Sequence, residues 1–256
     1  MSRPIAFDPK VAAGKPRSEH HDPCPFCVPE ELTGILAVEE DRIWLKNKYP
    51  VMRGTEMTVV VETADHDGDI TNYSREAWRK ILQFSWSKWR EMTAERRFQS
   101  VILYRNFGPV SGGSIRHPHA QIIGLEEFDY MTTVRSSQLD GTVLWEDGDV
   151  RVTLSDDPVG AFREFNFRLA HERSLDVWAD RIREVVRYVT APTGGGYTSY
   201  NLFFYPQAQG VCKVVARGVT SPLLVGYGLA QAPVEAERER IRGELEAVWE
   251  ADGGES

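Results

Sequence analysis

Two histidines and one amide side chain alternate along a short stretch of the chain, His117-Pro-His119-Ala-Gln121. If this stretch is a β-strand, the three side chains project from the same side, because side chains alternate across a strand. A neutral imidazole near pH 7 is a competent nucleophile toward phosphorus and gives a phosphoramidate that a second acceptor can discharge. The spacing therefore predicts that His119 is a nucleophile that attacks a phosphorus atom. Pro118 stiffens the backbone next to it.

A glycine-rich segment runs from Asn106 to Ser114 as Asn-Phe-Gly-Pro-Val-Ser-Gly-Gly-Ser. Such a loop can present backbone N–H groups to phosphate oxygens without obstruction by side chains. Ser114 and Gln121 are neutral donors suited to oxygens on which charge redistributes. A Gly-Gly pair is more often a turn, and a lone histidine is more often an ordinary structural residue. The combination of loop, paired histidines and amide favours a functional site.

Cys24 and Cys27, in Cys-Pro-Phe-Cys, have the spacing that lets two thiolates reach one tetrahedral cation. A redox pair would follow a strand and precede a helix, whereas prolines flank this pair on both sides. We therefore favour a metal site over a redox pair or purely structural cysteines. His66 and His117 are the candidates for the missing ligands. They would complete a Cys2His2 zinc site without an open position, which indicates a structural metal.

The other histidines, the third cysteine and the tryptophans are expected to have ordinary structural roles. We expect hydrogen-bonded surface or core positions for the histidines His20, His21 and His171, and a buried position for Cys212, which acts as a small apolar residue. We expect core positions for the tryptophans at helical spacing, Trp78, Trp86 and Trp89.

The composition limits the classes of protein to which the chain can belong. It has 256 residues, a formal net charge of −8 and 41% hydrophobic residues, which indicates one large or two small globular domains. Its apolar stretches are far shorter than the roughly 18–20 residues of a membrane helix, and the N-terminus lacks a secretory signal, so we expect a cytoplasmic protein. Three cysteines are too few for a disulfide framework. The net negative charge argues against binding of long nucleic acid. A small phosphorylated ligand is still compatible with the composition.

Strand-like runs alternate with two expected helices, one from an N-cap at Ser74 to about Met92 and one from Leu175 to about Val189. A weak internal repeat has an offset of about 100 residues. Segments 43–51, 57–61, the first helix and 100–106 correspond to 150–159, 165–169, the second helix and 199–205. Two copies of one α+β unit fit the length. The first copy contains the cysteine pair and three of the six histidines, so we expect the reactive centre there.

Five motifs in one order over about 100 residues resemble the galactose-1-phosphate uridylyltransferase branch of the histidine triad superfamily. They are Cys24-Pro-Phe-Cys27, Asn47-Lys-Tyr-Pro-Val51, Asp65-His66, Asn106-Phe-Gly108 with Ser111-Gly-Gly-Ser114, and His117-Pro-His119-Ala-Gln121. The resemblance implies an α+β fold of two histidine-triad-like repeats, with antiparallel sheets, packed helices and a degenerate second repeat. It also implies one structural zinc and a homodimer. We expect an irregular arm at 1–22, a catalytic repeat with the zinc site at 23–135, the second repeat at 136–232, and a charged helix with a tail at 233–256.

The resemblance further implies a nucleotidyltransferase of the EC 2.7.7 class with a ping-pong mechanism. A nucleotide or nucleotide-sugar donor would leave its nucleotidyl group on His119, and a small phosphorylated acceptor would collect it. Gln121 and Ser114 would assist catalysis. The residues expected to contact the nucleotide or its phosphates are Asn47, Asn106, Gly108, Gly112, Gly113, Ser114, Gln121 and Tyr227. The alternatives are a nucleotide hydrolase or phosphorylase that uses the same histidine, and a zinc-stabilised nucleotide-binding module without turnover.

The second half departs from the family pattern at the segment Val225-Gly-Tyr227. The lysine expected three residues before Val225 is Pro222, and the glutamate expected after Tyr227 is Gly228. In the family these two side chains hold phosphate and sugar hydroxyls. We therefore expect an acceptor other than galactose 1-phosphate, with Lys213 or Arg217 as candidate phosphate contacts.

Overall fold

The structure is a computed structural model that describes residues 5–14, 24–160 and 162–252. His20 and His21 lie outside the described residues. The chain forms two compact units, each built from three segments. Unit 1 comprises Met1–Asp69, Lys80–Arg105 and Gly113–Val134, and unit 2 comprises Ile70–Arg79, Asn106–Gly112 and Arg135–Ser256.

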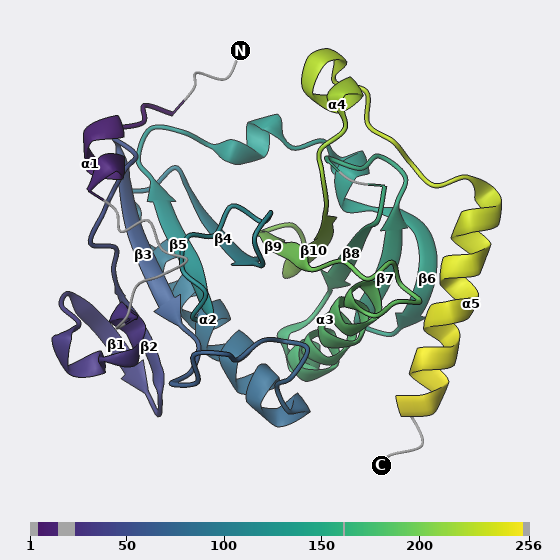
Figure 1. Ribbon diagram of the computed structural model, residues 1–256, viewed down its shortest axis with the longest axis horizontal. Helices are drawn as coiled ribbons and strands as arrows, with labels where there is room; N and C mark the ends of the chain where they lie inside the picture. The colour runs from purple at the N-terminus through teal and green to yellow at the C-terminus, as the bar shows by residue number, and fades with distance from the viewer. Residues whose placement is uncertain (1–4, 15–23, 161, 253–256) are drawn as a thin grey trace. The chain divides into compact units, whose positions relative to one another are not determined.

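Unit 1 contains antiparallel strands in the spatial order β1-β2-β3-β5-β4 (Figure 1). Their bounds are β1 (Ile35–Glu39), β2 (Arg42–Lys46), β3 (Thr55–Val61), β4 (Ser100–Phe107) and β5 (His119–Leu125). The helix α2 (Arg75–Thr93) connects β3 to β4. As predicted, Ser74 caps this helix, since its hydroxyl accepts the N–H of Ala77 at 3.1 Å.

The sheet of unit 1 has two different faces. On the face that α2 covers, the Trp89 Nε1 donates to the Val101 carbonyl at 2.9 Å, and the Lys88 ammonium lies 5.9 Å from the Trp44 ring centroid. Strand alternation places His119 and Gln121 on the opposite face. That face also carries two apolar clusters, Ile43, Leu45, Val59 and Val61, and Val51, Met57, Ile123 and Leu125. The predicted reactive residues therefore lie on a sheet face whose remaining positions are mostly apolar.

Unit 2 repeats this arrangement with the order β6-β7-β8-β10-β9. Its strands are β6 (Gly141–Asp147), β7 (Val150–Ser155), β8 (Glu164–Leu169), β9 (Ser199–Tyr205) and β10 (Gly210–Arg217). The helix α3 (Leu175–Thr190) connects β8 to β9, and the Trp178 Nε1 donates to the Phe167 carbonyl at 2.8 Å. The prediction of an α+β fold with antiparallel strands is confirmed, and the two predicted helices begin and end close to their expected residues.

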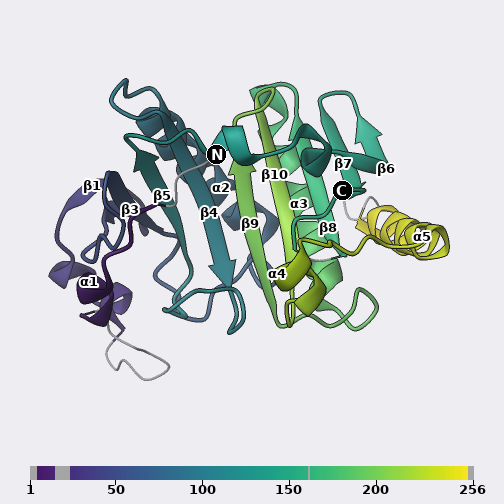
Figure 2. The same cartoon turned by 90° about the horizontal axis from the view of Figure 1, so that it is seen from above.

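The charged C-terminal helix α5 (Glu235–Asp252) lies beside β6 (Figures 1 and 2). Arg242 donates to the Val143 carbonyl at 3.3 Å, and the Trp145 and Trp249 ring centroids are 6.3 Å apart. The Tyr188 hydroxyl donates to Glu244 at 2.6 Å. This helix therefore packs on unit 2 through its apolar and aromatic side, as its amphipathic pattern indicates.

Several short elements complete the chain. The segment predicted to be an irregular arm contains α1, where the Asp8 carboxylate accepts the N–H groups of Lys10 and Val11 and Pro9 is the first helical residue. The short elements are α1 (Pro9–Ala13), η1 (Pro25–Cys27), η2 (Pro29–Glu31), η3 (Tyr130–Thr133), η4 (Ser136–Leu139), η5 (Glu172–Ser174) and α4 (Pro222–Tyr227).

The residues expected to have ordinary roles are placed accordingly. Cys212 is fully buried in β10, and the side chain of His171 is 62% exposed. The three tryptophans at helical spacing, Trp78, Trp86 and Trp89, are buried. Among the described residues, no helix combines the length and the apolar character that crossing a membrane requires.

Candidate functional site

The four predicted metal ligands, Cys24, Cys27, His66 and His117, come together in unit 1, where their ligand atoms all lie within 4.8 Å of one another. The Cys27 Sγ lies 3.3 Å from the His66 Nδ1 and 3.4 Å from the His117 Nδ1. A tetrahedral zinc with bonds of about 2.3 Å to sulfur and 2.0 Å to nitrogen separates its ligands by roughly 3.3–3.8 Å. Donor types and spacing therefore fit a Cys2His2 zinc site.

A backbone contact orients His117 toward this cluster. Its Nε2 lies 2.8 Å from the Thr63 carbonyl oxygen, which can only accept, so Nε2 carries the proton. The Nδ1 lone pair is then directed at the Cys27 side of the cluster. His117 is fully buried, and burial lowers its pKa, which favours the neutral form that binds a metal.

A second backbone contact orients His119, the first residue of β5. Its Nδ1 lies 2.8 Å from the His117 carbonyl oxygen, so Nδ1 carries the proton and Nε2 keeps its lone pair. His119 is 7% exposed, and burial lowers its pKa. The Phe26 ring centroid lies 5.6 Å from that of His119. Burial therefore favours the neutral imidazole, and the backbone contact selects the tautomer with its proton on Nδ1.

The expectation that His117, His119 and Gln121 share one side of a strand is wrong for His117. The strand β5 begins at His119, and His117 lies in the turn before it. Pro118 has no N–H to offer a ladder, although its carbonyl accepts the Glu62 N–H at 3.1 Å. His119 and Gln121 do share a face, because they pair with Val61 and Val59 two positions apart on β3.

Sequence reasoning missed a buried ion cluster in the same unit. Arg105 Nε lies 2.6 Å from Glu62 Oε1, and Arg105 Nη1 lies 3.1 Å from Asp69 Oδ1, with all three side chains at most 3% exposed. The charge of Glu62 raises the pKa of His119, whereas that of Arg105 lowers it, and burial outweighs both. In the sequence, two of these residues could have been recognised because each is a charged residue at the end of an apolar strand-like run. The runs are Val59-Val-Val-Glu62 and Val101-Ile-Leu-Tyr-Arg105.

The predicted nucleotide contacts are divided between the units. Asn47, Gly113, Ser114 and Gln121 belong to unit 1 with His119, and Asn106, Gly108, Gly112 and Tyr227 belong to unit 2. The Asn47 Oδ1 accepts the Tyr49 N–H at 2.8 Å, which leaves its Nδ2 as the donor end. Tyr227, the last residue of α4, is 77% exposed.

In unit 2 the glycine-rich segment is held by β9, a role that sequence reasoning did not assign. The Ser199 Oγ accepts the Val110 N–H at 3.2 Å. The Asn201 Nδ2 donates to the Asn106 Oδ1 at 2.6 Å and to the Ser111 carbonyl at 3.0 Å. Ser199 and Asn201 are at most 1% exposed. In the sequence, the pattern that could have indicated this role is Ser199-Tyr-Asn201 at the start of an otherwise apolar and aromatic strand.

Two glycines of this segment allow a matched test of its packing. Gly108 and Gly112 both have left-handed φ values, +83° and +88°, which cost a residue with a side chain about 1–2 kcal/mol. A Cβ at Gly108 would lie 2.2 Å from the Thr198 carbonyl oxygen, whereas one at Gly112 would meet nothing within 4 Å. Gly108→Ala should therefore destabilise the protein by about 1–3 kcal/mol more than Gly112→Ala in denaturant unfolding. Equal losses would show that the close approach to Thr198 is not a constraint.

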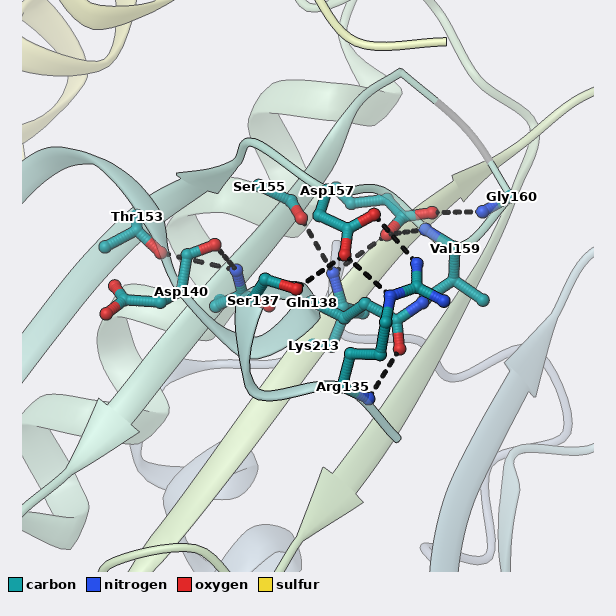
Figure 3. Close-up of polar contacts among 12 residues, drawn as sticks. Arg135, Ser137, Gln138, Asp140, Thr153, Ser155, Asp157, Val159, Gly160 and Lys213 are labelled. Atoms are coloured by element: carbon teal, nitrogen blue, oxygen red, sulfur yellow. Dashed lines mark hydrogen bonds and ion pairs between the residues drawn. The ribbon is translucent and has the colours of Figure 1, made fainter. Parts of the chain in front are cut away.

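Lys213, one of two candidate phosphate contacts, is fully buried and is excluded from that role. Its ammonium lies 2.8 Å from Glu164 and 3.3 Å from the Ser155 hydroxyl (Figure 3). The same carboxylate accepts the N–H groups of Val159 and Gly160 at 2.8 and 2.7 Å. The charge of Lys213 is therefore balanced inside the protein, and Arg217 remains as the candidate.

Two repeats with one strand order, and a Cys2His2 cluster beside an oriented His-Pro-His turn, define the fold of the chain, which is similar to that of a uridylyltransferase structure with 16% identity and a TM-score of 0.69 over 95% of this chain and 98% of that chain. The chain belongs to the DUF4931 family. Residues 7–128 match the N-terminal domain of the domain of unknown function DUF4931, and residues 131–249 match its C-terminal domain.

Comparisons with known proteins agree with this assignment. A DUF4931 family protein from Bacillus cereus ATCC 10987 is 38% identical, with a TM-score of 0.75 over 84% of this chain and 99% of that chain. An ADP-glucose phosphorylase from Arabidopsis thaliana, with bound ADP-glucose, is 15% identical, with a TM-score of 0.67 over 91% of this chain and 93% of that chain, and this likeness shows the fold. A galactose-1-phosphate uridylyltransferase from Streptomyces lividans is 27% identical over 103 residues, 40% of this chain. The alignment spans 29% of that relative's length.

Proposed function

We propose that the protein is a nucleotidyltransferase of the EC 2.7.7 class that acts on a nucleoside diphosphate sugar or a related nucleotide through a covalent nucleotidyl-His119. The observation that carries this proposal is the contact of 2.8 Å between the His119 Nδ1 and the His117 carbonyl. That contact reserves Nε2 as an unprotonated nucleophile. A protein that only binds nucleotides has no need of a histidine oriented in this way.

The proposed reaction has two steps. In the first, the His119 Nε2 lone pair attacks the α-phosphorus of the donor, a P–N bond forms, and the P–O bond to the leaving phosphate breaks with its electron pair. In the second, an oxygen of the acceptor phosphate forms a new P–O bond and the P–N bond breaks. The proton stays on Nδ1 throughout and is donated to the His117 carbonyl, so the positive charge that develops on the ring is stabilised by this backbone oxygen.

Polar groups near His119 in sequence are proposed to stabilise the phosphate charge. Gln121 lies on the same face of β5, and Ser114 precedes the histidines in the chain. We assign these two residues to the phosphate oxygens, and Asn47 and the glycine-rich segment to the nucleotide. The acceptor is proposed to differ from galactose 1-phosphate, since Pro222 and Gly228 replace the expected lysine and glutamate.

We also propose one structural zinc on Cys24, Cys27, His66 and His117. With four protein ligands it has no open position, and it would supply rigidity to the turn that carries the His117 carbonyl. A homodimer and a cytoplasmic location remain part of the same proposal.

Phosphorolysis is the second candidate reaction, because the fold likeness includes an ADP-glucose phosphorylase. Inorganic phosphate would then take the place of the phosphorylated acceptor and release a nucleoside diphosphate. Water in the same role would make the protein a hydrolase that releases a nucleoside monophosphate.

Intact-protein mass spectrometry after brief incubation with nucleotide sugars, ATP and diadenosine polyphosphates tests the proposal. We expect an added mass of one nucleotidyl group in the wild-type protein and none in His119→Ala. The exposed surface histidine offers a matched control, and His171→Ala should label like the wild type. Analysis of released nucleotides with and without inorganic phosphate separates transfer, phosphorolysis and hydrolysis. The absence of both adduct and released nucleotide with every donor would contradict the proposal.

A further inference from the structure

Arg217, the last residue of β10, is a half-buried cation without a carboxylate partner in the described parts of the chain. Its Nη1 donates to the Asn201 Oδ1 at 3.2 Å. An amide oxygen is a neutral acceptor, so the full positive charge of the guanidinium remains unbalanced. Removing such a charge from water costs free energy unless an anion compensates it.

The partner of Arg217 connects it to the glycine-rich segment. The Asn201 Nδ2 donates to the Asn106 Oδ1 and to the Ser111 carbonyl, and Asn201 is 1% exposed. Because an amide has one accepting and one donating end, these contacts direct the Asn201 Oδ1 toward Arg217. The guanidinium is thereby held next to the segment Asn106–Gly112 within unit 2.

The segment itself leaves room for a ligand, since the space around a Cβ at Gly112 is open to 4 Å. The Ser111 carbonyl of the peptide that joins Ser111 to Gly112 accepts from Asn201, so the Gly112 N–H points away from Asn201. The guanidinium of Arg217 is therefore the donor of this site, and a guanidinium is well suited to bind an oxyanion. Lys213, on the same face of β10, has the opposite character, since Glu164 neutralises it.

We propose that Arg217 binds a phosphate group of the substrate and that Asn201 is its positioning residue. Only the identity of the ligand as a phosphorylated substrate rests on the proposed function. The phosphate can come from the nucleotide or from a sugar phosphate, and both present the same dianionic oxygens to a guanidinium. Arg217 would thus supply a cationic phosphate contact from β10, where position 222 holds a proline instead of the lysine expected there.

Isothermal titration calorimetry on the full chain tests this proposal. The ligands are inorganic phosphate, the common nucleoside monophosphates and glucose 1-phosphate, with uncharged nucleosides as comparators. We expect Arg217→Gln to weaken at least one phosphorylated ligand by about tenfold or more, to leave nucleoside binding unchanged, and to be partly rescued by Arg217→Lys. The ligand that is weakened identifies the nucleotide or the sugar phosphate as the source.

The chain provides a matched control in Arg168, which lies on the same sheet face and is half-buried without a carboxylate partner among the described residues. Arg168→Gln should bind all ligands like the wild type, because Arg168 pairs with Val211 at the other end of β10. Because Asn201 is proposed to position Arg217, Asn201→Ala should lower the affinity for phosphate. The same substitution should have no further effect in protein that already carries Arg217→Gln.

Three results would overturn the assignment: unchanged affinities in Arg217→Gln, an equal loss in Arg168→Gln, or a wild-type protein that binds none of these anions. The outcome is independent of the labelling of His119. Loss of phosphate binding in Arg217→Gln without any nucleotidyl adduct would refute the transferase and leave the phosphate site standing.

Discussion

Replacement of Cys27 by serine is expected to abolish stoichiometric zinc binding and to lower the melting temperature of the protein. The Cys27 Sγ is the atom that contacts both histidines of the cluster, at 3.3 and 3.4 Å. A hydroxyl is a much weaker zinc ligand than a thiolate, so three ligands remain. Structural zinc binding is worth an apparent 10–16 kcal/mol, roughly, in small zinc-dependent domains. Unit 1 also has its own apolar core, so we expect a loss of part of this free energy and not complete unfolding.

Elemental analysis of metal per chain, followed by thermal unfolding with and without a chelator, measures this effect. We expect about one zinc per wild-type chain. The buried cysteine of unit 2 offers the control, since Cys212→Ala removes a thiol and should keep the metal. A wild-type protein without zinc, or Cys27→Ser protein with wild-type zinc content and melting temperature, would contradict the assignment of the cluster.

Replacement of Lys213 by methionine is expected to destabilise the protein by about 3–5 kcal/mol, the range for breaking a buried ion pair on one side. Lys213 and Glu164 are both completely buried, 2.8 Å apart. Burial lowers the pKa of Lys213, while the charge of Glu164 raises it. The substitution leaves the Glu164 carboxylate with backbone donors from Val159 and Gly160 but without its cation.

Denaturant unfolding of the two single variants and the double variant Lys213→Met/Glu164→Gln isolates the pair. We expect the double variant to be more stable than Lys213→Met, because no uncompensated charge is then buried. Strictly additive losses in the double variant would show that the two charges are not coupled.

Local patterns were sufficient to predict the two long connecting helices, the charged C-terminal helix and several of the strands. The apolar period and the Ser74 cap located α2, and the offset repeat anticipated two units with the same strand order. The cysteine pair indicated its two histidine partners, because metal chemistry restricts donor types so strongly. In each case one residue type or spacing carried the information.

What the sequence did not predict depends on contacts between distant segments. The start of β5 at His119 follows from Pro118, which cannot donate to a strand ladder, and the tautomer of His119 follows from a single backbone carbonyl. The burial of Lys213 required Glu164, which lies 49 residues earlier in the chain. Charges within strands have no local signature that distinguishes an internal partner from a bound ligand, so Lys213 and Arg217 could not be separated before the structure.

Unit 2 is built partly from the first half of the chain, and this has a consequence for recombination and truncation. Trp78 donates to the Ala179 carbonyl at 2.8 Å, Arg183 donates to the Tyr73 carbonyl at 2.9 Å, and Asn106 is bonded to Asn201. A cut between the two matched regions, near residue 130, would strip these partners from the second half. The two halves of the chain therefore do not fold as independent modules. A chimaera that joins the first half of one homologue to the second half of another should be stable only if these contacts are kept.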